Sequence, residues 1–144
     1  MSLSKSKTGA LMVFERKNML DDAIKTGTAL DCTVNAELLK NIFWNKAPLH
    51  DGAVIVRAGR IVGAGCMLPM SGNVNLSREL GMRHRAGIGA SEHTDAVVAI
   101  VSEETGSISV AVGGMLKRHL APETLERLLR NELLPEREND EAAS

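Results

Sequence analysis

The segment Thr94–Val101, TDAVVAIV, is almost continuously apolar. A run of this kind, rich in valine and isoleucine, is typical of a strand that lies in the middle of a sheet and is buried on both faces. Ser102–Gly106 then predicts a turn, and Ser107–Val112 predicts a second strand that pairs with the first. The chain is therefore expected to form a sheet whose centre is hidden from water, so that helices have to cover its faces.

Three more strands are expected from short apolar runs that end at turn residues. They are Ala10–Glu15, Ala53–Arg57 and Arg60–Cys66, and the last two flank the turn signal Ala58-Gly59. Pro69–Asn75 reads as a polar loop.

Four helices are expected between and after these strands. Met19–Thr26 is short, with Gly27 able to end it, and Asn35–Trp44 has Asn35 as its N-cap. A weaker helix is expected over Leu76–Ser91, because its glycines lower helix propensity, and the last helix runs from Pro122 to about Leu134. The glycines of the weak helix allow two explanations, close packing on the sheet or close approach of a ligand.

The composition favours one domain with an aliphatic core. The chain has 144 residues, of which 44% are hydrophobic, and its 17 basic and 18 acidic residues give a formal net charge of -1. This balance argues against a nucleic-acid partner, which usually requires a basic excess. The predicted architecture is a mixed α/β domain over 8–134, with residues 1–7 as a connector or expression remnant and 135–144 as an acidic, disordered tail.

Cys32 and Cys66 stand alone, without a CxxC pattern, so reduced thiols are expected rather than a zinc site or a disulfide. No apolar run reaches the length of about 18 residues that a membrane-spanning helix needs.

One cluster of basic side chains lies within the predicted glycine-containing helix. Arg83, His84 and Arg85 are consecutive, inside the segment Gly81–Glu92, GMRHRAGIGASE. Two guanidinium groups and an imidazole suit the oxygens of one anionic group such as a phosphate. A solvent-exposed charge cluster is the alternative explanation of the same residues.

A second motif is His50-Asp51-Gly52-Ala53, directly before the strand Ala53–Arg57. Asp51 can bind a metal or orient a hydroxyl group, and Gly52 lets a substrate approach the backbone. Asp51 can equally be a turn residue, and a lone histidine such as His50 is more often structural.

The third motif, Ser102-Glu103-Glu104, ends the most apolar strand. Ligand sites of open α/β sheets favour strand ends, so this acidic pair can contribute to a metal site, or it can be an exposed turn. Two acidic clusters and a basic cluster are the side chains that metal-assisted phosphoryl or nucleotidyl transfer uses. The chain contains no Walker A motif and no GxGxxG after a strand.

The three segments LHDGAVIV, SRELGMRHRAGIGASE and VSEETGSISV together resemble the DisA_N (DAC) domain of bacterial diadenylate cyclases, most closely the membrane-anchored type. The similarity covers about Thr8 to Leu134. It implies a mixed sheet flanked by helices and the synthesis of cyclic di-AMP from two ATP molecules with release of two pyrophosphates. It also implies a face-to-face homodimer, in which the 3′-hydroxyl of each ATP attacks the α-phosphate of the other.

The resemblance also implies roles for individual residues. Asp51 would bind a divalent metal (Mg²⁺, Mn²⁺ or Co²⁺) or help to activate the 3′-hydroxyl, with His50 and Glu104 as further metal ligands. Arg83, His84 and Arg85 would act with Asp51 as catalytic residues and engage the phosphates. The expected contacts with the nucleotide are made by Gly52, Ala53, Met67, Leu68, Met82, Ser102 and Glu104. Leu68 falls where the family packs the adenine.

Two positions depart from the family pattern. Met67 stands where an aromatic residue is common, and Met82 stands where threonine commonly precedes the basic triplet. Methionine can still pack on a purine through its sulfur, whereas a hydroxyl contact at position 82 is lost. Both methionines can instead be core residues.

Proteins of the membrane-anchored type carry transmembrane helices before this domain, at the cytoplasmic face of the membrane, and have regulatory protein partners. This chain is therefore expected to be a soluble part of such a protein, and a naturally soluble version is the alternative. Two other functions remain open, an adenine-nucleotide sensor that has lost catalysis and a structural domain whose charged clusters are only solvated.

Overall fold

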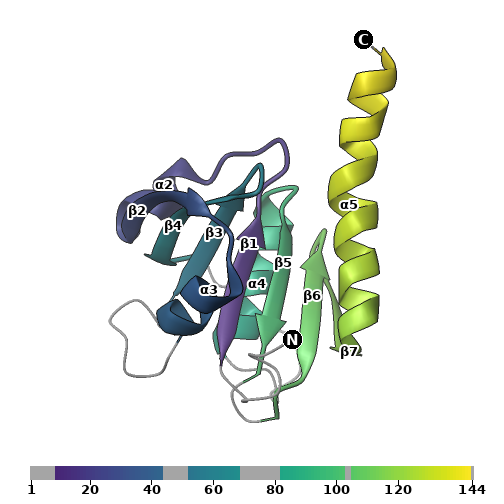
Figure 1. Cartoon of the computed structure of the whole chain (residues 1–144). Helices are drawn as coiled ribbons and strands as arrows, with labels where there is room; N and C mark the ends of the chain where they lie inside the picture. The colour runs from purple at the N-terminus through teal and green to yellow at the C-terminus, as the bar shows by residue number, and fades with distance from the viewer. Residues whose placement is uncertain (1–8, 44–51, 69–81, 103–104, 144) are drawn as a thin grey trace.

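The computed structural model describes residues 9–43, 52–68, 82–102 and 105–143 (Figure 1). Strands from these ranges form one seven-stranded sheet in the order β2-β4-β3-β1-β5-β6-β7. Their bounds are β1 Ala10–Phe14, β2 Thr28–Thr33, β3 Ala53–Arg57, β4 Arg60–Cys66, β5 Val97–Val101, β6 Ile108–Val112 and β7 Met115–Leu120. The β1–β3 pair is parallel and the other pairs are antiparallel, so the sheet is mixed, as the sequence predicts.

Helices cover both faces of this sheet. Helix α2 (Asp21–Thr26) and helix α4 (Met82–His93) pack on one face, and α3 (Ala36–Phe43) and α5 (Pro122–Ala143) lie on the other (Figure 1). Strand residues alternate between the two cores: Leu11 and Val13 face the α4 side, whereas Met12 faces the α3 side. The central strands are therefore buried on both faces, which explains their uninterrupted apolar sequences.

The two outermost strands, β2 and β7, were not predicted. Their sequences, TALDCT and MLKRHL, mix polar and apolar residues, and more than half of their residues are exposed. An edge strand needs no apolar run, because it has a pairing partner on one side only. The pairing of β2 with β4 and of β7 with β6 gives these segments their extended conformation.

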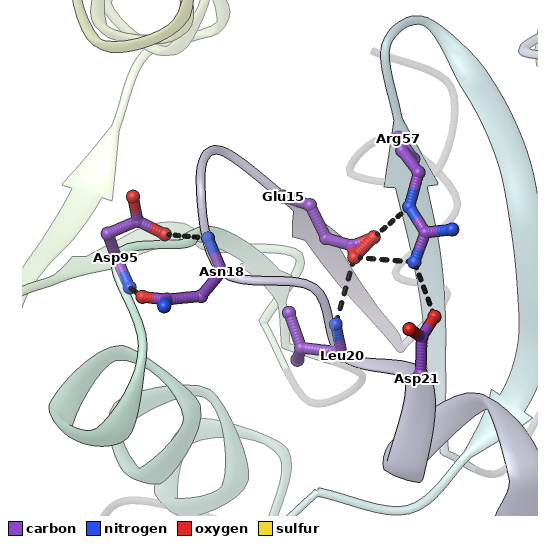
Figure 2. Close-up of polar contacts among 6 residues, drawn as sticks. All are labelled: Glu15, Asn18, Leu20, Asp21, Arg57 and Asp95. Carbon is purple, nitrogen blue, oxygen red and sulfur yellow. Dashed lines mark hydrogen bonds and ion pairs between the residues drawn. The ribbon is translucent and has the colours of Figure 1, made fainter.

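The predicted local signals are mostly confirmed. The Oδ1 atom of Asn35 accepts a hydrogen bond of 3.1 Å from the amide of Leu38, as an N-cap does. Strand β5 begins at Val97 rather than Thr94, because Asp95 accepts hydrogen bonds from the amides of Lys17 and Asn18, both 3.0 Å, and anchors the loop after β1 (Figure 2).

Helix α4 begins at Met82, and residues 76–81 of the predicted helix lie outside the described residues, as does the predicted loop 69–75. A Cβ atom at Gly87 would lie 2.9 Å from Cδ1 of Ile100. Close packing of α4 on β5 therefore accounts for this glycine, the first of the two explanations that the sequence left open.

Helix α5 is longer than predicted, because it continues past Leu134 to Ala143 (Figure 1). The prediction of a disordered tail after 134 relied on the lack of large apolar residues. Its glutamate, arginine and alanine residues favour a helix and Pro135 disfavours one, and a helix already nucleated by packing can extend without a new nucleation cost. The packing that holds its start includes the buried side chain of Leu125.

A buried ion pair joins β1 and β3 at one end of the sheet. The carboxylate of Glu15, which is buried, accepts hydrogen bonds from Nε and Nη2 of Arg57 at 2.8 and 3.0 Å and from the amide of Leu20 at 2.9 Å (Figure 2). The same guanidinium donates to Asp21 at 2.9 Å. These hydrogen bonds raise the pKa of Arg57, and they fix the start of α2 against the sheet.

Replacing Arg57 by methionine is expected to destabilise the protein by about 3 kcal/mol, because the buried Glu15 carboxylate would lose its counter-ion. Urea denaturation of the variant and the parent protein measures this difference. Arg60→Met is the matched control, since Arg60 pairs with the exposed Asp31 at 2.7 Å and such surface pairs contribute about 0–1 kcal/mol. Equal effects of the two substitutions would contradict the role given to Glu15.

Candidate functional site

The register of the strands brings the separate sequence motifs to one end of the sheet. Ala10, at the start of β1, pairs with Val101, at the end of β5, and Ala53, at the start of β3, pairs with Cys66, at the end of β4. Strands β1 and β3 run in the same direction. Gly9, Gly52, Met67 and Ser102, which directly precede or follow these strands, therefore lie along the same end, which we call the site edge.

The backbone conformation at position 52 requires a glycine. Its φ of 88° is in the left-handed region. A Cβ atom at this position would lie 2.7 Å from the carbonyl oxygen of Cys66 and 2.8 Å from the carbonyl carbon of Gly65. The chain entering β3 and the chain leaving β4 thus touch through their backbones, and Ala53 behind them is fully buried.

Met67 and Leu68 leave the site edge in different environments. The Met67 side chain is 63% exposed, so the alternative that it is a core residue is wrong. Leu68 is buried in the core on the α4 side of the sheet. An exposed thioether offers an apolar surface on which a planar base can pack.

The basic triplet lies at the site edge as well. The guanidinium of Arg83 lies against Gly9, where a Cβ atom would be 2.7 Å from Cζ and from Nη1 of Arg83. The other end of α4 is at the β6–β7 turn, where the amide of Gly114 donates to Oγ of Ser91 at 3.0 Å. Arg83, His84 and Arg85 therefore occupy the first turn of α4, where the helix dipole adds to their attraction for an anion.

The surroundings of His84 favour the neutral form of its imidazole over the charged form. Burial lowers the pKa of its imidazole below the ordinary value of 6.5, and the positive charges of Arg118 and Arg83 lower this pKa further. A neutral imidazole can accept a proton or a hydrogen bond, in contrast to the guanidinium groups beside it.

Arg118, on β7, is a site-edge residue that the sequence analysis missed. It lies two residues before Leu120, which pairs with Ile108 at the start of β6. Nothing in the sequence links it to the basic triplet, because only the pairing of the edge strand β7 brings its charge near His84. The site edge is therefore more basic than the triplet alone indicates.

Ser102 follows β5 in a tight loop. Its amide donates to the carbonyl of Ser107 at 3.0 Å, and its carbonyl accepts from the amide of Gly106 at 2.9 Å. Oγ of Ser107 lies 2.9 Å from Nδ1 of His119, which joins this loop to β7. Ser102 is therefore held at the site edge. Its loop is joined to β7, the strand that carries Arg118.

Three predicted metal ligands, His50, Asp51 and Glu104, lie outside the described residues, and so does the side chain of Met82. Within the described part of the chain, no group of three or more histidine, cysteine, aspartate or glutamate side chains is arranged to hold a metal ion. The metal site thus stays a prediction from the sequence.

One end of this mixed sheet combines glycine backbone, an exposed apolar side chain and the basic start of a helix. This combination is typical of domains that bind nucleotides. The chain belongs to the family described as DisA bacterial checkpoint controller nucleotide-binding (DAC), whose model matches residues 1–116.

Characterised relatives show which members of this family the chain is similar to. The chain is 48% identical over 130 residues to the cyclic di-AMP synthase CdaA of Bacillus subtilis, covering 90% of the chain and 48% of that protein. It is 46% identical over 132 residues to a diadenylate cyclase of Listeria monocytogenes, covering 92% of the chain and 48% of that protein. The chain spans about half the length of these relatives.

Solved structures show the same fold. A crystal structure of a double mutant of DacA from Staphylococcus aureus superposes with a TM-score of 0.89 at 45% identity, covering 91% of this chain and 87% of that one. A structure described as a hypothetical membrane spanning protein from Bacillus cereus gives a TM-score of 0.80 at 47% identity, covering 83% and 59%. The predicted family and fold class are confirmed.

None of the helices in the described ranges combines the length and the apolar character needed to cross a lipid bilayer.

Proposed function

We propose that the chain is the catalytic domain of a diadenylate cyclase, which joins two ATP molecules into cyclic di-AMP and releases two pyrophosphates. The observation that carries this proposal is the site edge itself. It gathers Gly52, Met67, the first turn of α4 and Ser102, which are far apart in the sequence, at one end of the sheet. The names of the relatives, cyclic di-AMP synthase and diadenylate cyclase, agree with this activity.

The charges of the site edge suit the triphosphate of ATP. Arg83 and Arg85 would bind phosphate oxygens by bidentate hydrogen bonds, at a helix start that favours negative charge. Arg118 would add to the positive field there. Attack at an α-phosphate depends on alignment and charge neutralisation more than on a strong base, so these cations would stabilise the transition state directly.

The base and the sugar would occupy the part of the site edge near β3 and β4. Met67 would pack on the face of the adenine, next to Leu68, and the backbone at Gly52 and Ala53 would lie against the nucleotide. Ser102, held by the loop after β5, would line the same region from the other side. Met82 precedes the triplet and would adjoin the nucleotide.

A divalent cation, Mg²⁺, Mn²⁺ or Co²⁺, would be held by Asp51, with His50 and Glu104 as further ligands. The chemistry of this donor set fits, because carboxylate oxygens and an imidazole are suitable ligands for these ions. When bound, the cation neutralises phosphate charge. Asp51 would also orient the 3′-hydroxyl group.

Two copies of the domain would be needed for the reaction, because each site holds one ATP. In the face-to-face homodimer, the oxygen of each 3′-hydroxyl forms a bond to the α-phosphorus of the opposite ATP and loses its proton. The bond from that phosphorus to the bridging oxygen breaks, and pyrophosphate leaves. Two such steps close the ring of cyclic di-AMP.

In the complete protein, we propose that this domain, over about residues 8–134, is anchored at the cytoplasmic face of a bacterial membrane and has regulatory protein partners. The description of the Bacillus cereus relative as membrane spanning supports the anchor.

Incubation with ATP and each of the three cations tests the proposed activity, with cyclic di-AMP and pyrophosphate as the measured products. Two moles of pyrophosphate are expected for each mole of cyclic di-AMP. Analytical ultracentrifugation of the same sample establishes whether dimers are present. ATP binding without product, in a sample that contains dimers, would refute the cyclase and favour the alternative, a silent adenine-nucleotide sensor with the same fold.

A further inference from the structure

The hydroxyl group of Thr26, the last residue of α2, holds the backbone where the chain leaves β4. Oγ1 of Thr26 accepts a hydrogen bond of 2.8 Å from the amide of Met67 and donates one of 2.6 Å to the carbonyl of Ala23. Since a hydroxyl has a single proton, the bond to Ala23 turns a lone pair of Oγ1 toward Met67. The orientation of the Met67 amide is therefore set by a side chain of another element.

The residues just before Met67 have little freedom to shift. A Cβ atom at Gly27 would lie 2.4 Å from the carbonyl oxygen of Ala64, and one at Gly52 would lie 2.7 Å from that of Cys66. Between them, Gly65 has a φ of 64°, in the left-handed region. Backbone contacts from Gly27 and Gly52 thus fix the end of β4 on two sides. Met67 is the first residue beyond these contacts, and Thr26 bonds its amide.

Helix α2 is itself anchored at its other end. The amide of Leu20 donates to the buried carboxylate of Glu15, and Asp21 accepts from Arg57 (Figure 2). Along its length, Ile24 packs against the middle of β4, where a Cβ atom at Gly63 would lie 3.3 Å from Cγ1 of Ile24. Because α2 is fixed at its start and in its middle, Thr26 is a rigid point of attachment.

We infer that Thr26 is a positioning residue for the nucleotide base and contributes to selectivity for adenine. The inference rests on the proposed function, in which the Met67–Leu68 segment packs against the base. Met67 is exposed between the buried residues Cys66 and Leu68, so the hydrogen bond to Thr26 restrains the one residue of this segment whose side chain faces solvent. Thr26 itself does not have to touch the nucleotide to have this effect.

Thr26→Val removes the hydroxyl and keeps the shape of the side chain. The dissociation constant of α,β-methylene ATP, whose α–β bridge cannot be split, is expected to rise about fivefold, the equivalent of one lost hydrogen bond. The preference for this compound over its guanine counterpart is expected to fall by a similar factor. In turnover, KM for ATP should rise while kcat stays within about twofold. Thr26→Ser, which keeps the hydroxyl, should restore KM to the wild-type value.

Thr33→Val is the matched control, since Thr33 is an exposed threonine at the far end of β2, where it pairs with Arg60. Calorimetric titration of the four proteins with both analogues measures affinity and base preference, and thermal unfolding shows that each is folded. Wild-type affinity and base preference in a folded Thr26→Val protein would overturn the inference.

If Thr26→Val does not fold, Thr26→Ala is titrated in its place, and the exchange of the Met67 amide in the wild-type protein is measured with and without the adenine analogue. Slower exchange in the complex is expected, and unchanged exchange would overturn the inference. A wild-type protein that binds neither analogue refutes the proposed function itself. One that binds the adenine analogue but makes no cyclic di-AMP refutes only the cyclase activity, and the Thr26 comparison can still be made.

Discussion

Replacement of Arg83 and His84 by alanine is expected to lower cyclic di-AMP synthesis by about a thousandfold or more, as losses of phosphate-binding cations do in phosphoryl transfer. Both residues lie in the first turn of α4, where the helix dipole, Arg85 and Arg118 form a positive field at the site edge. The double variant removes the guanidinium of Arg83, proposed to bind phosphate, and the imidazole of His84 together. Product formation under saturating ATP, followed by chromatography, measures the loss.

Two further variants separate charge, geometry and stability in this experiment. Arg83→Lys keeps the positive charge but loses the planar guanidinium, so most of the activity is expected to be lost with it as well. Arg130→Ala removes an exposed arginine of α5 that pairs with Glu126, and it should retain full activity. A folded double variant that keeps more than a tenth of the parent activity would show that the triplet does not bind the reacting phosphates.

Gly52→Ala is expected to destabilise the protein by about 3 kcal/mol or more and to abolish most of the activity. Part of this cost is the left-handed backbone at a φ of 88°, which is about 1–2 kcal/mol for a residue with a Cβ atom. The rest arises because the new methyl group would lie 2.7 Å from the carbonyl oxygen of Cys66, so that the two strand ends have to separate. Urea denaturation measures the stability, and product formation measures the activity.

Gly59→Ala is the matched control for this substitution. Gly59 has a similar φ of 79°, at the turn after β3, but no heavy atom lies within 4 Å of the position that its Cβ would take. It should therefore lose only the backbone part, about 1–2 kcal/mol, and keep normal activity. Equal losses at the two glycines would mean that the contact between the ends of β3 and β4 has no energetic importance.

Local sequence signals predicted the elements that have their own pattern. The apolar runs identified β1, β3, β4, β5 and β6 to within a few residues, and Ala58-Gly59 marked the hairpin turn correctly. Helices α2 and α3 were likewise found, with Gly27 ending the first and Asn35 capping the second. These features depend on residues that are neighbours in the chain, so no tertiary information is needed to find them.

Other features depend on partners that are distant in the sequence. The strand character of β2 and β7 comes from pairing with β4 and β6, and the start of β5 depends on the capture of the β1–α2 loop by Asp95. Helix α5 extends beyond its predicted end to Ala143, although Pro135 within the added residues disfavours a helix. Exposed Met67 was not distinguished from a core methionine, since its neighbours Cys66 and Leu68 are both buried.

The sequence by itself determined the family and the chemistry of the motifs, because the identities of Asp51, Gly52, Arg83, His84 and Arg85 are read directly from their order. The family model and the fold similarity confirm the family, whereas the chemistry of the motifs stays a prediction. Only the tertiary structure decided that Gly52, Met67, Ser102 and the first turn of α4 share one end of the sheet, and that Arg118 lies near His84 and Thr26 bonds the amide of Met67. The physical reason is that strand register and helix packing, rather than distance along the chain, set which side chains and backbone groups meet.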